Sequence, residues 1–232
     1  MSELFEALTA RVRARPADPL ITWYGPDGVR TELSTVTFAT AVAKTAGALV
    51  AEWDVEPGAG VRLELPLHWQ LPVWLAACDL AGLVVVFDDS PCDVVVTDSE
   101  TATEVTALTQ HVITSTTTFG LPGPALPAPL LDHARDAMGQ PDVYLAPPAE
   151  GAWRVAGQLW DVADIADRAR ALTAAPGGGP HERLLVTPHA DGIRRALAVW
   201  PAPLVSGSSV VLCAAGDPDA ISAAEHAGVR IG

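Results

Sequence analysis

Two titratable residues stand close together beyond an apolar run: His189 and Asp191, with Gly192 directly after them. An imidazole near a carboxylate suits general acid–base chemistry, because histidine changes its charge near neutral pH. The other interpretation is a strand-to-helix loop in which both residues help to cap the following helix. His189, Asp191 and Gly192 are therefore candidate ligand-binding residues, and no residue is assigned a catalytic role.

Four aspartates surround the apolar runs in the middle of the chain: Asp88, Asp89, Asp93 and Asp98. Clustered carboxylate oxygens can hold a hard cation, but these residues lack the regular spacing of a calcium loop. We expect a solvated acidic rim and no metal site.

The three cysteines, Cys78, Cys92 and Cys213, are odd in number and far apart in sequence. Cys78 and Cys213 lie in apolar patterns typical of core residues, whereas Cys92 is expected to be more exposed and has no neighbouring histidine. Such cysteines fit a reducing compartment, so a cytoplasmic location is expected. Lys44 is the single lysine, and a mechanism that needs a lysine must use it.

Composition excludes several classes of function. The chain has 232 residues, 49% hydrophobic content, 14 basic residues and a formal net charge of −14, so a globular core is expected but no basic stripe for nucleic acid. Residues 1–14 lack an uninterrupted apolar core, and no later run reaches the length of a membrane span. The sequence also contains no nucleophile-elbow pattern, no H-E-x-x-H pattern and no paired Cys-x-x-Cys pattern. These absences argue against the commonest hydrolases and zinc proteins.

The elements that position these residues centre on residues 61–87. The apolar spacing predicts a strand at 61–65, a helix at about 69–81 and a strand at 83–87, with Gly82 at the expected helix cap. This order is a βαβ unit. The next apolar run, 94–97, follows too closely for a crossover helix, so it is expected to pair antiparallel or to lie elsewhere in the sheet.

Further elements are expected on both sides of this unit. Before it we expect a helix starting after Ser2, a hairpin of strands 20–24 and 30–33, and a long helix capped by Ser34. After it the pattern predicts strands at 111–114, 183–187, 209–213 and from 229, with helices at 161–173, about 192–205 and after Asp217. Residues 121–148 are expected to be mostly irregular, and the glycines at 177–179 resemble a flexible connection.

The predicted fold class is α/β, with an open, mostly parallel mixed sheet flanked by helices. We expect a single domain over residues 1–232, with possible sub-lobes 1–118 and 149–232 joined by an irregular segment 119–148.

Several short segments resemble the amino-terminal part of the adenylate-forming, AMP-binding enzymes of the acyl-CoA synthetase type. The matching stretches are 21–24 (ITWY), 33–34 (LS), 46–49 (AGAL), 55–58 (VEPG), 62–66 (RLELP), 76–77 (AA), 81–82 (AG), 201–212 (PAPLVSGSSVVL) and 217–218 (DP). The resemblance covers most of the chain and implies the amino-terminal subdomains of that fold, in a short, truncated relative. It also places His189 where the family often has a histidine or an aromatic residue at its acyl pocket.

The family resemblance implies a Ser/Thr/Gly-rich loop that follows a strand and wraps ATP phosphates with backbone N–H groups. Where that loop is due, after residues 142–145 taken as a strand, the sequence reads Ala-Pro-Pro-Ala-Glu-Gly over 146–151. The two prolines remove donors, and Glu150 would face the phosphates. An upstream run, 114–123, resembles the motif in its serine and threonine content but lacks the glycines and the lysine that the motif requires. It is expected to be a strand end and loop.

The family also places an adenine and metal cluster, and a mobile domain with a charge-stabilising lysine, beyond the segment that this chain matches. Lys44 lies in an early helix and does not substitute. We therefore expect no cofactor, with ATP and Mg²⁺ not binding in the usual way. The prediction is a non-catalytic binding or interaction module; the alternative is an acyl- or adenylate-ligand-binding component of an adenylate-forming enzyme system.

Partners are inferred from the tryptophans and from sheet edges. Trp69, Trp153, Trp160 and Trp200 are large rings of the kind enriched at interfaces, although core packing explains them equally well. A sheet edge left open is also a pairing site. A homodimer and a small acyl or nucleotide ligand are thus the expected partners, with no nucleic acid and no membrane.

Overall fold

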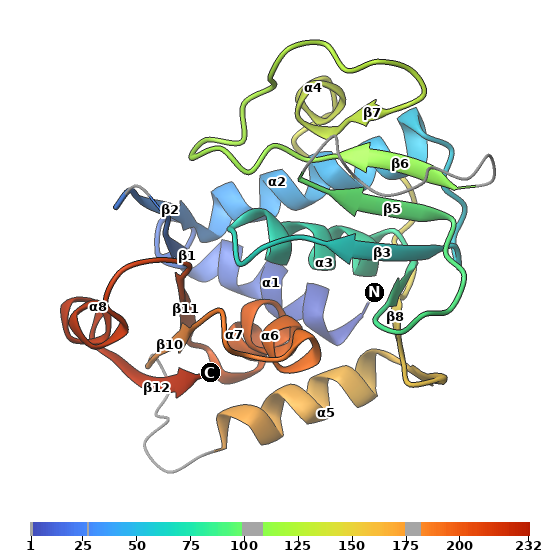
Figure 1. Cartoon of the computed structure of the whole chain (residues 1–232). Helices are drawn as coiled ribbons and strands as arrows, with labels where there is room; N and C mark the ends of the chain where they lie inside the picture. Colours follow the sequence, from blue (N-terminus) through green and yellow to red (C-terminus); the bar gives the residue numbers. More distant parts are fainter. Residues whose placement is uncertain (1, 27, 99–108, 175–181) are drawn as a thin grey trace. The chain divides into compact units, whose positions relative to one another are not determined.

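A computed structural model describes residues 2–26, 28–98, 109–174 and 182–232 (Figure 1). The chain divides into two compact units, each assembled from separate stretches. The first unit contains Met1–Ala39, Pro66–Pro72 and Val162–Gly232. The second contains Thr40–Leu65 and Val73–Asp161. The glycines at 177–179 lie outside the described residues.

The first unit is built on a five-stranded sheet with the order β12-β10-β11-β1-β2. Its strands are β1 (Pro19–Tyr24), β2 (Arg30–Ser34), β10 (Arg183–Val186), β11 (Ser209–Cys213) and β12 (Ala227–Ile231). β1, β11, β10 and β12 run parallel, and β2 returns antiparallel to β1 as the predicted hairpin. The pairing of β1 with β11 joins segments almost the whole chain apart.

Helices cover both faces of this sheet. They are α1 (Glu3–Ala14), α5 (Val162–Thr173), α6 (Gly192–Val199), α7 (Pro201–Ser206) and α8 (Pro218–Glu225). Ile221 of α8 packs on Leu185, Val211 and Cys213. Successive side chains of a strand point to opposite faces of the sheet. The buried strand residues that alternate with Leu185, Val211 and Cys213 therefore face away from α8, toward the face where α6 and α7 lie in Figure 1. There the Trp200 ring lies 5.7 Å from Phe5 and 5.8 Å from Phe38.

The second unit is built on a seven-stranded sheet with the order β7-β6-β5-β3-β4-β8-β9. The strands are β3 (Gly60–Glu64), β4 (Val84–Val86), β5 (Val94–Thr97), β6 (Gln110–Ile113), β7 (Leu131–Asp132), β8 (Ala152–Val155) and β9 (Gln158–Trp160). All of these strands except β9 run parallel to one another, and β9 turns back antiparallel to β8. α3 (Gln70–Leu80) connects β3 to β4, which confirms the predicted βαβ unit.

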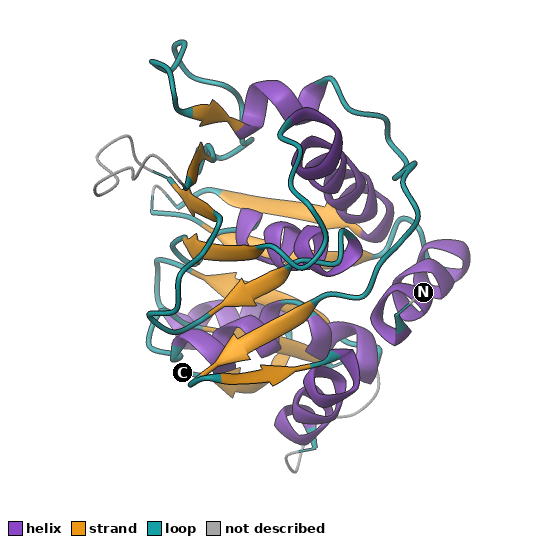
Figure 2. Ribbon diagram, turned by 90° about the vertical axis from the view of Figure 1, so that its right-hand side faces the viewer, coloured by secondary structure: helices purple, strands orange, loops and turns teal. Residues whose placement is uncertain are grey.

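Other helices complete the architecture. α2 (Thr35–Gly47) continues as one π-helical turn, η1 (Ala48–Glu52), and α4 (His133–Met138) follows β7. Both α2 and α3 cross from one unit into the other in sequence. Helices line the strands throughout (Figure 2), so the α/β class with mostly parallel strands is confirmed, as two sheets. Within the described ranges, none of the helices is both long and apolar enough to cross a bilayer.

Most predicted elements are confirmed, and three predictions need correction. β5 pairs parallel with β3, on the side of β3 that faces away from β4. The predicted antiparallel pairing is therefore wrong, and the alternative, a place elsewhere in the sheet, is confirmed. The segment 121–148 contains the short β7 and α4 and is otherwise without helix or strand, so it is mostly irregular, as expected. Residues 142–145 form no strand; the strand is β8, farther along, and it pairs with β4. The predicted helix at 192–205 is divided into α6 and α7 at Trp200, which precedes Pro201.

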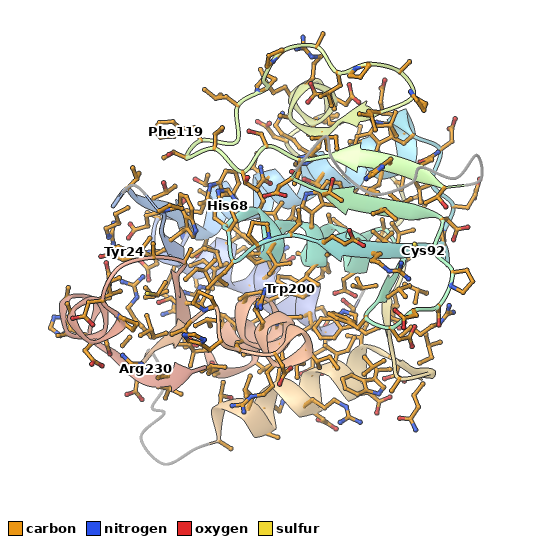
Figure 3. The ribbon with its side chains drawn as sticks, viewed as in Figure 1. Tyr24, His68, Cys92, Phe119, Trp200 and Arg230 are labelled. Atoms are coloured by element: carbon orange, nitrogen blue, oxygen red, sulfur yellow. The ribbon has the colours of Figure 1, made fainter. Side chains whose placement is uncertain are left out.

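The tryptophans are mostly core residues. Trp153 and Trp200 are both about 2% exposed, and Trp74, in the middle of α3, is fully buried. The first two therefore give no support to an interface, and core packing explains them. Cys78 and Cys213 are buried and Cys92, which is labelled in Figure 3, is partly exposed, as expected.

Candidate functional site

A cavity of about 400 Å³ lies at the carboxyl edge of the first unit's sheet. Ten residues line it: Tyr24, Gly25, Pro26, Gly28, Ala215, Gly216, Asp217, Ala220, Ile221 and Ala224. They follow the carboxyl ends of β1 and β11 or belong to α8. In open α/β sheets this edge is where small ligands bind, because strand ends and helix starts leave a crevice there.

Local backbone geometry builds this cavity. The Tyr24 carbonyl accepts the N–H groups of Ala214 and Ala215 at 3.1 and 3.2 Å, which fixes the chain after β11 beside β1. Gly216 has φ +95°, and a Cβ atom there would come within 3.1 Å of the Ile221 side chain. Asp217 accepts the Asp219 N–H at 3.0 Å and so caps α8, as predicted. The lining is therefore small and largely apolar, with one carboxylate already used in capping.

Tyr24 brings the one aromatic ring of this lining (Figure 3). Its hydroxyl donates to Glu225 Oε1 at 2.6 Å. Burial, together with the hydrogen bond and charge of Glu225, raises the pKa of Tyr24, so the hydroxyl remains protonated at neutral pH. With a protonated phenol, an occupied carboxylate and small apolar groups, this cavity is equipped to bind a ligand and lacks a nucleophile with an adjacent base.

The three residues predicted from sequence follow β10 at the same edge. His189 and Asp191 are exposed, and Asp191 Oδ1 accepts the Arg194 N–H at 2.8 Å, which makes it the N-cap of α6. Within the described part of the chain, no hydrogen bond joins His189 to Asp191, and neither they nor Gly192 line the cavity. Asp191 thus has the capping role of the second interpretation, and ligand binding by the three residues stays a prediction.

The residues that do line the cavity had no local signal in the sequence. Tyr24 and Gly216 are brought together by the pairing of β1 with β11, whose register places Tyr24 beside Cys213. The Gly25 to Gly28 turn indicates only a hairpin connection, and Gly216, before the Asp217 cap, belongs to no recognisable motif. A turn at the end of each of two parallel strands was the signal that could have identified this edge.

In the second unit, residues 146–152 lie against the end of α3. Ala149 N–H donates to the Leu80 carbonyl at 3.3 Å, and Gly151 N–H donates to the Asp79 carbonyl at 3.1 Å. A Cβ atom on Gly82 would come within 2.4 Å of Ala149 Cβ. These contacts satisfy carbonyls that the last turn of a helix leaves free. The segment therefore acts as the C-terminal cap of α3.

The chain after β8 turns back at once. Ala156 and Gly157 have φ +48° and +77°, the left-handed conformation of a two-residue hairpin turn, and β9 follows directly. The Gly157 N–H donates to Asp88 Oδ2 at 2.8 Å. Hydrogen bonds from Ser90 and Gly157 lower the pKa of Asp88 to about 2. No phosphate-sized loop separates β8 from β9.

The acidic residues around these strands have local protein partners. Asp88 accepts the Ser90 and Gly157 N–H groups, and Asp93 Oδ2 accepts the Gly60 N–H at 2.7 Å. Among the described residues, no group of three or more His, Cys, Asp or Glu side chains has the arrangement of a metal site. These carboxylates fasten loops to the sheet.

The hydroxyl-rich run at 114–117 lines a second cavity, of about 290 Å³, at the carboxyl edge of the second unit's sheet. Asp98 and Asp132 line it too. Thr114 Oγ1 is occupied by the Trp74 indole N–H at 3.2 Å and by His133 Nδ1 at 2.8 Å. The run is a strand end and loop, as expected, and two carboxylates make its surroundings unfavourable to a phosphate.

The fold is that of the acyl-CoA synthetases. The crystal structure of a Brucella canis acyl-CoA synthetase superposes with a TM-score of 0.76 and 16% sequence identity, over 99% of this chain and 47% of that chain. The present chain thus spans about half the length of that structure.

Sequence comparison gives the family. A TIGR03089 family protein of Mycobacterium tuberculosis (strain ATCC 25618 / H37Rv) is 31% identical over 222 residues, which cover 91% of this chain and 89% of that protein. The chain belongs to the TIGR03089 family. No protein-family model matches it.

Proposed function

We propose that this chain is a non-catalytic binding module that keeps the acyl-CoA synthetase-like fold without ATP-dependent chemistry. The observation that carries the proposal concerns the segment where the family resemblance implies a phosphate loop: its backbone N–H groups form hydrogen bonds within the protein. A phosphate cradle needs several backbone N–H groups that point into open space. In the segment 146–152 two residues are prolines, and the N–H groups of Ala149, Gly151 and Ala152 donate to carbonyls in and just after α3.

Charge supports the same proposal. Glu150 is exposed beside the segment, and the carboxyl of Asp79 lies beneath it. The negative charge of Glu150 would oppose a triphosphate. The direct β8–β9 turn leaves no other loop after that strand to hold one.

Titration with ATP and Mg²⁺ tests this proposal. Calorimetry and thermal unfolding are expected to give no saturable signal, whereas an ATP-binding acyl-CoA synthetase titrated in parallel provides the positive control. A ligand that binds the native state stabilises it by about 2.7 kcal/mol at a concentration of 100 Kd, so binding would be plain in both assays. Saturable stabilisation with one-to-one stoichiometry would overturn the proposal.

The carboxyl-edge cavity favours a second candidate, an acyl-ligand-binding component. Its volume and its Gly, Ala and Tyr24 lining suit an apolar chain or ring, which gains free energy by leaving water. Short- and medium-chain acyl compounds are the probes. Ala220→Leu, which fills the cavity, should abolish a thermal shift that Ala223→Leu, at an exposed α8 position outside the lining, preserves. Equal effects of the two variants would exclude this cavity.

Partners and location complete the proposal. Homodimerisation rests on the edge strands β2, β12, β7 and β9, and light scattering that gives a monomer at micromolar concentrations would refute it. A cytoplasmic, reducing location rests on three cysteines that form no disulfide.

A further inference from the structure

A small cavity of about 230 Å³ lies at the amino edge of the first unit's sheet. Pro19, Arg183 and Ser209, which begin β1, β10 and β11, contribute to its lining. The complete lining is Arg11, Arg15, Asp18, Pro19, Arg183, Gly207, Ser208 and Ser209. The amino ends of these parallel strands are opposite to the edge that carries the larger, apolar cavity.

Positive charge is concentrated here. The whole chain has 14 basic residues and a net charge of −14, yet three arginines share this one small lining with a single carboxylate, Asp18. Arg183 is ion-paired with Glu225, which compensates its charge. Arg15 Nε lies 3.9 Å from Asp18 Oδ2, a long and half-exposed pair that contributes little. Arg11 is the third cation.

Arg11 is buried, at 8% exposure, and its hydrogen bonds go to neutral groups. Nε donates to Thr35 Oγ1 at 3.3 Å, Nη1 to the Ser208 carbonyl, and Nη2 to the Pro19 carbonyl at 3.3 Å. Across the described residues, no carboxylate lies within 4 Å of this guanidinium. Burial and the nearby charge of Arg15 lower the pKa of Arg11, while Asp18 acts in the opposite direction. A buried cation with no carboxylate in contact is costly.

The hydrogen-bonding groups of the lining are suited to an anion. Ser209 Oγ accepts a hydrogen bond from Arg183 Nε at 3.1 Å, so its own proton is left to donate. The carbonyls of Pro19 and Ser208 are already used by Arg11. Guanidinium groups bind carboxylate and phosphate oxygens with strong, charge-assisted hydrogen bonds.

We propose that this amino-edge cavity binds a small oxyanion, the phosphate or carboxylate group of a metabolite, with Arg11 and Arg15 as its countercharges and Ser209 as a further donor. The bound anion completes the charge balance of Arg11. The site is independent of the ATP-related chemistry of the synthetase fold and of the carboxyl-edge cavity.

Thermal unfolding with inorganic phosphate, at constant ionic strength set with sodium chloride, tests the site. Saturable stabilisation by phosphate is expected, and a parallel acetate series shows whether carboxylate binds as well. Arg15→Gln should weaken the apparent Kd about tenfold, equivalent to about 1.4 kcal/mol. Arg13→Gln, an exposed arginine on α1 outside the lining, is the matched control and should leave the Kd unchanged.

Asp18→Asn tests the proposal through a gain of phosphate affinity, which a weakened fold would not produce. Removal of the one carboxylate in the lining should tighten phosphate binding severalfold. Phosphate that stabilises no more than chloride, Arg15→Gln that behaves like Arg13→Gln, or Asp18→Asn that weakens binding would each overturn the proposal.

Discussion

The carboxyl group of Asp79 makes stability depend on pH in a direction that can be measured. Asp79 lies in the last turn of α3 at 4% exposure, and neither carboxylate oxygen has a hydrogen-bond partner among the described residues. Burial raises its pKa to about 7; the nearby Gly151 N–H, which donates to the Asp79 backbone carbonyl, offsets part of this rise, and Glu150 adds to it. The native state therefore holds a proton that the unfolded chain, with an Asp pKa near 3.8, has already lost.

The sign and size follow from proton linkage. Between pH 4 and 7 the native state binds more protons than the unfolded state, so this group makes the protein less stable as pH rises through that range. Between pH 5 and 8 the loss amounts to roughly 2 to 3 kcal/mol. His133 acts in the opposite direction, because burial lowers its pKa to about 4 and stability is lost as pH falls below the ordinary value of 6.5.

Asp79→Asn isolates the carboxylate, since the His133 contribution is common to both proteins. Urea unfolding at pH 5 and pH 8 gives the free energy of unfolding of each, and the difference, variant minus wild type, should rise by about 2 to 3 kcal/mol from pH 5 to pH 8. Any constant packing cost of the amide cancels. Asp89→Asn, at an exposed aspartate after β4, is the control. A difference that stays constant with pH would refute a protonated, buried Asp79.

Two further predictions concern contacts that hold elements in place. Gly82→Ala should cost about 3 kcal/mol in urea unfolding, because a left-handed residue at φ +72° would also collide with Ala149, whereas Gly157→Ala, at φ +77° with nothing within 4 Å, should cost about 1 kcal/mol; equal losses would contradict the collision. Glu225→Gln should cost about 2 kcal/mol, because this carboxylate, 7% exposed, joins Arg30 Nε at 2.7 Å and Arg183 to the end of α8. Glu32→Gln removes a half-exposed partner of Arg30 and should lower the free energy of unfolding by less than about 1 kcal/mol. A larger loss would show that the Arg30–Glu32 pair on β2, rather than Glu225, provides this stability.

Elements with strong local signals were predictable. The run from β3 through α3 to β4 has helical apolar spacing followed by a glycine at φ +72° and three valines, each a short-range preference that agrees with the next. Asp191 and Asp217 likewise cap helices as their positions before apolar-periodic segments predict.

Elements that depend on distant partners were not predictable. β7 has two residues and β9 has three, too few for a period-2 pattern, and both exist because a neighbouring strand offers its edge. The amino-edge cavity joins Arg11 to Arg183 and Ser209, residues from three elements whose proximity follows from the parallel pairing of β1, β11 and β10. The same pairing puts Tyr24 beside the chain after β11. No local pattern carries such information.

The segment 146–152 joins stability to function. Asp79 and Leu80 end α3 with carbonyls that accept N–H groups from Gly151 and Ala149, and Gly82 admits Ala149 because it has no side chain. A loop that presented these N–H groups to a phosphate would withdraw them from the helix end. The Leu80 carbonyl would lose the Ala149 N–H, at about 1 to 3 kcal/mol, whereas the Asp79 carbonyl would keep the Gly82 N–H at 3.2 Å. An N–H group that caps α3 is not available to a ligand at the same time. In this chain the end of α3 has these donors.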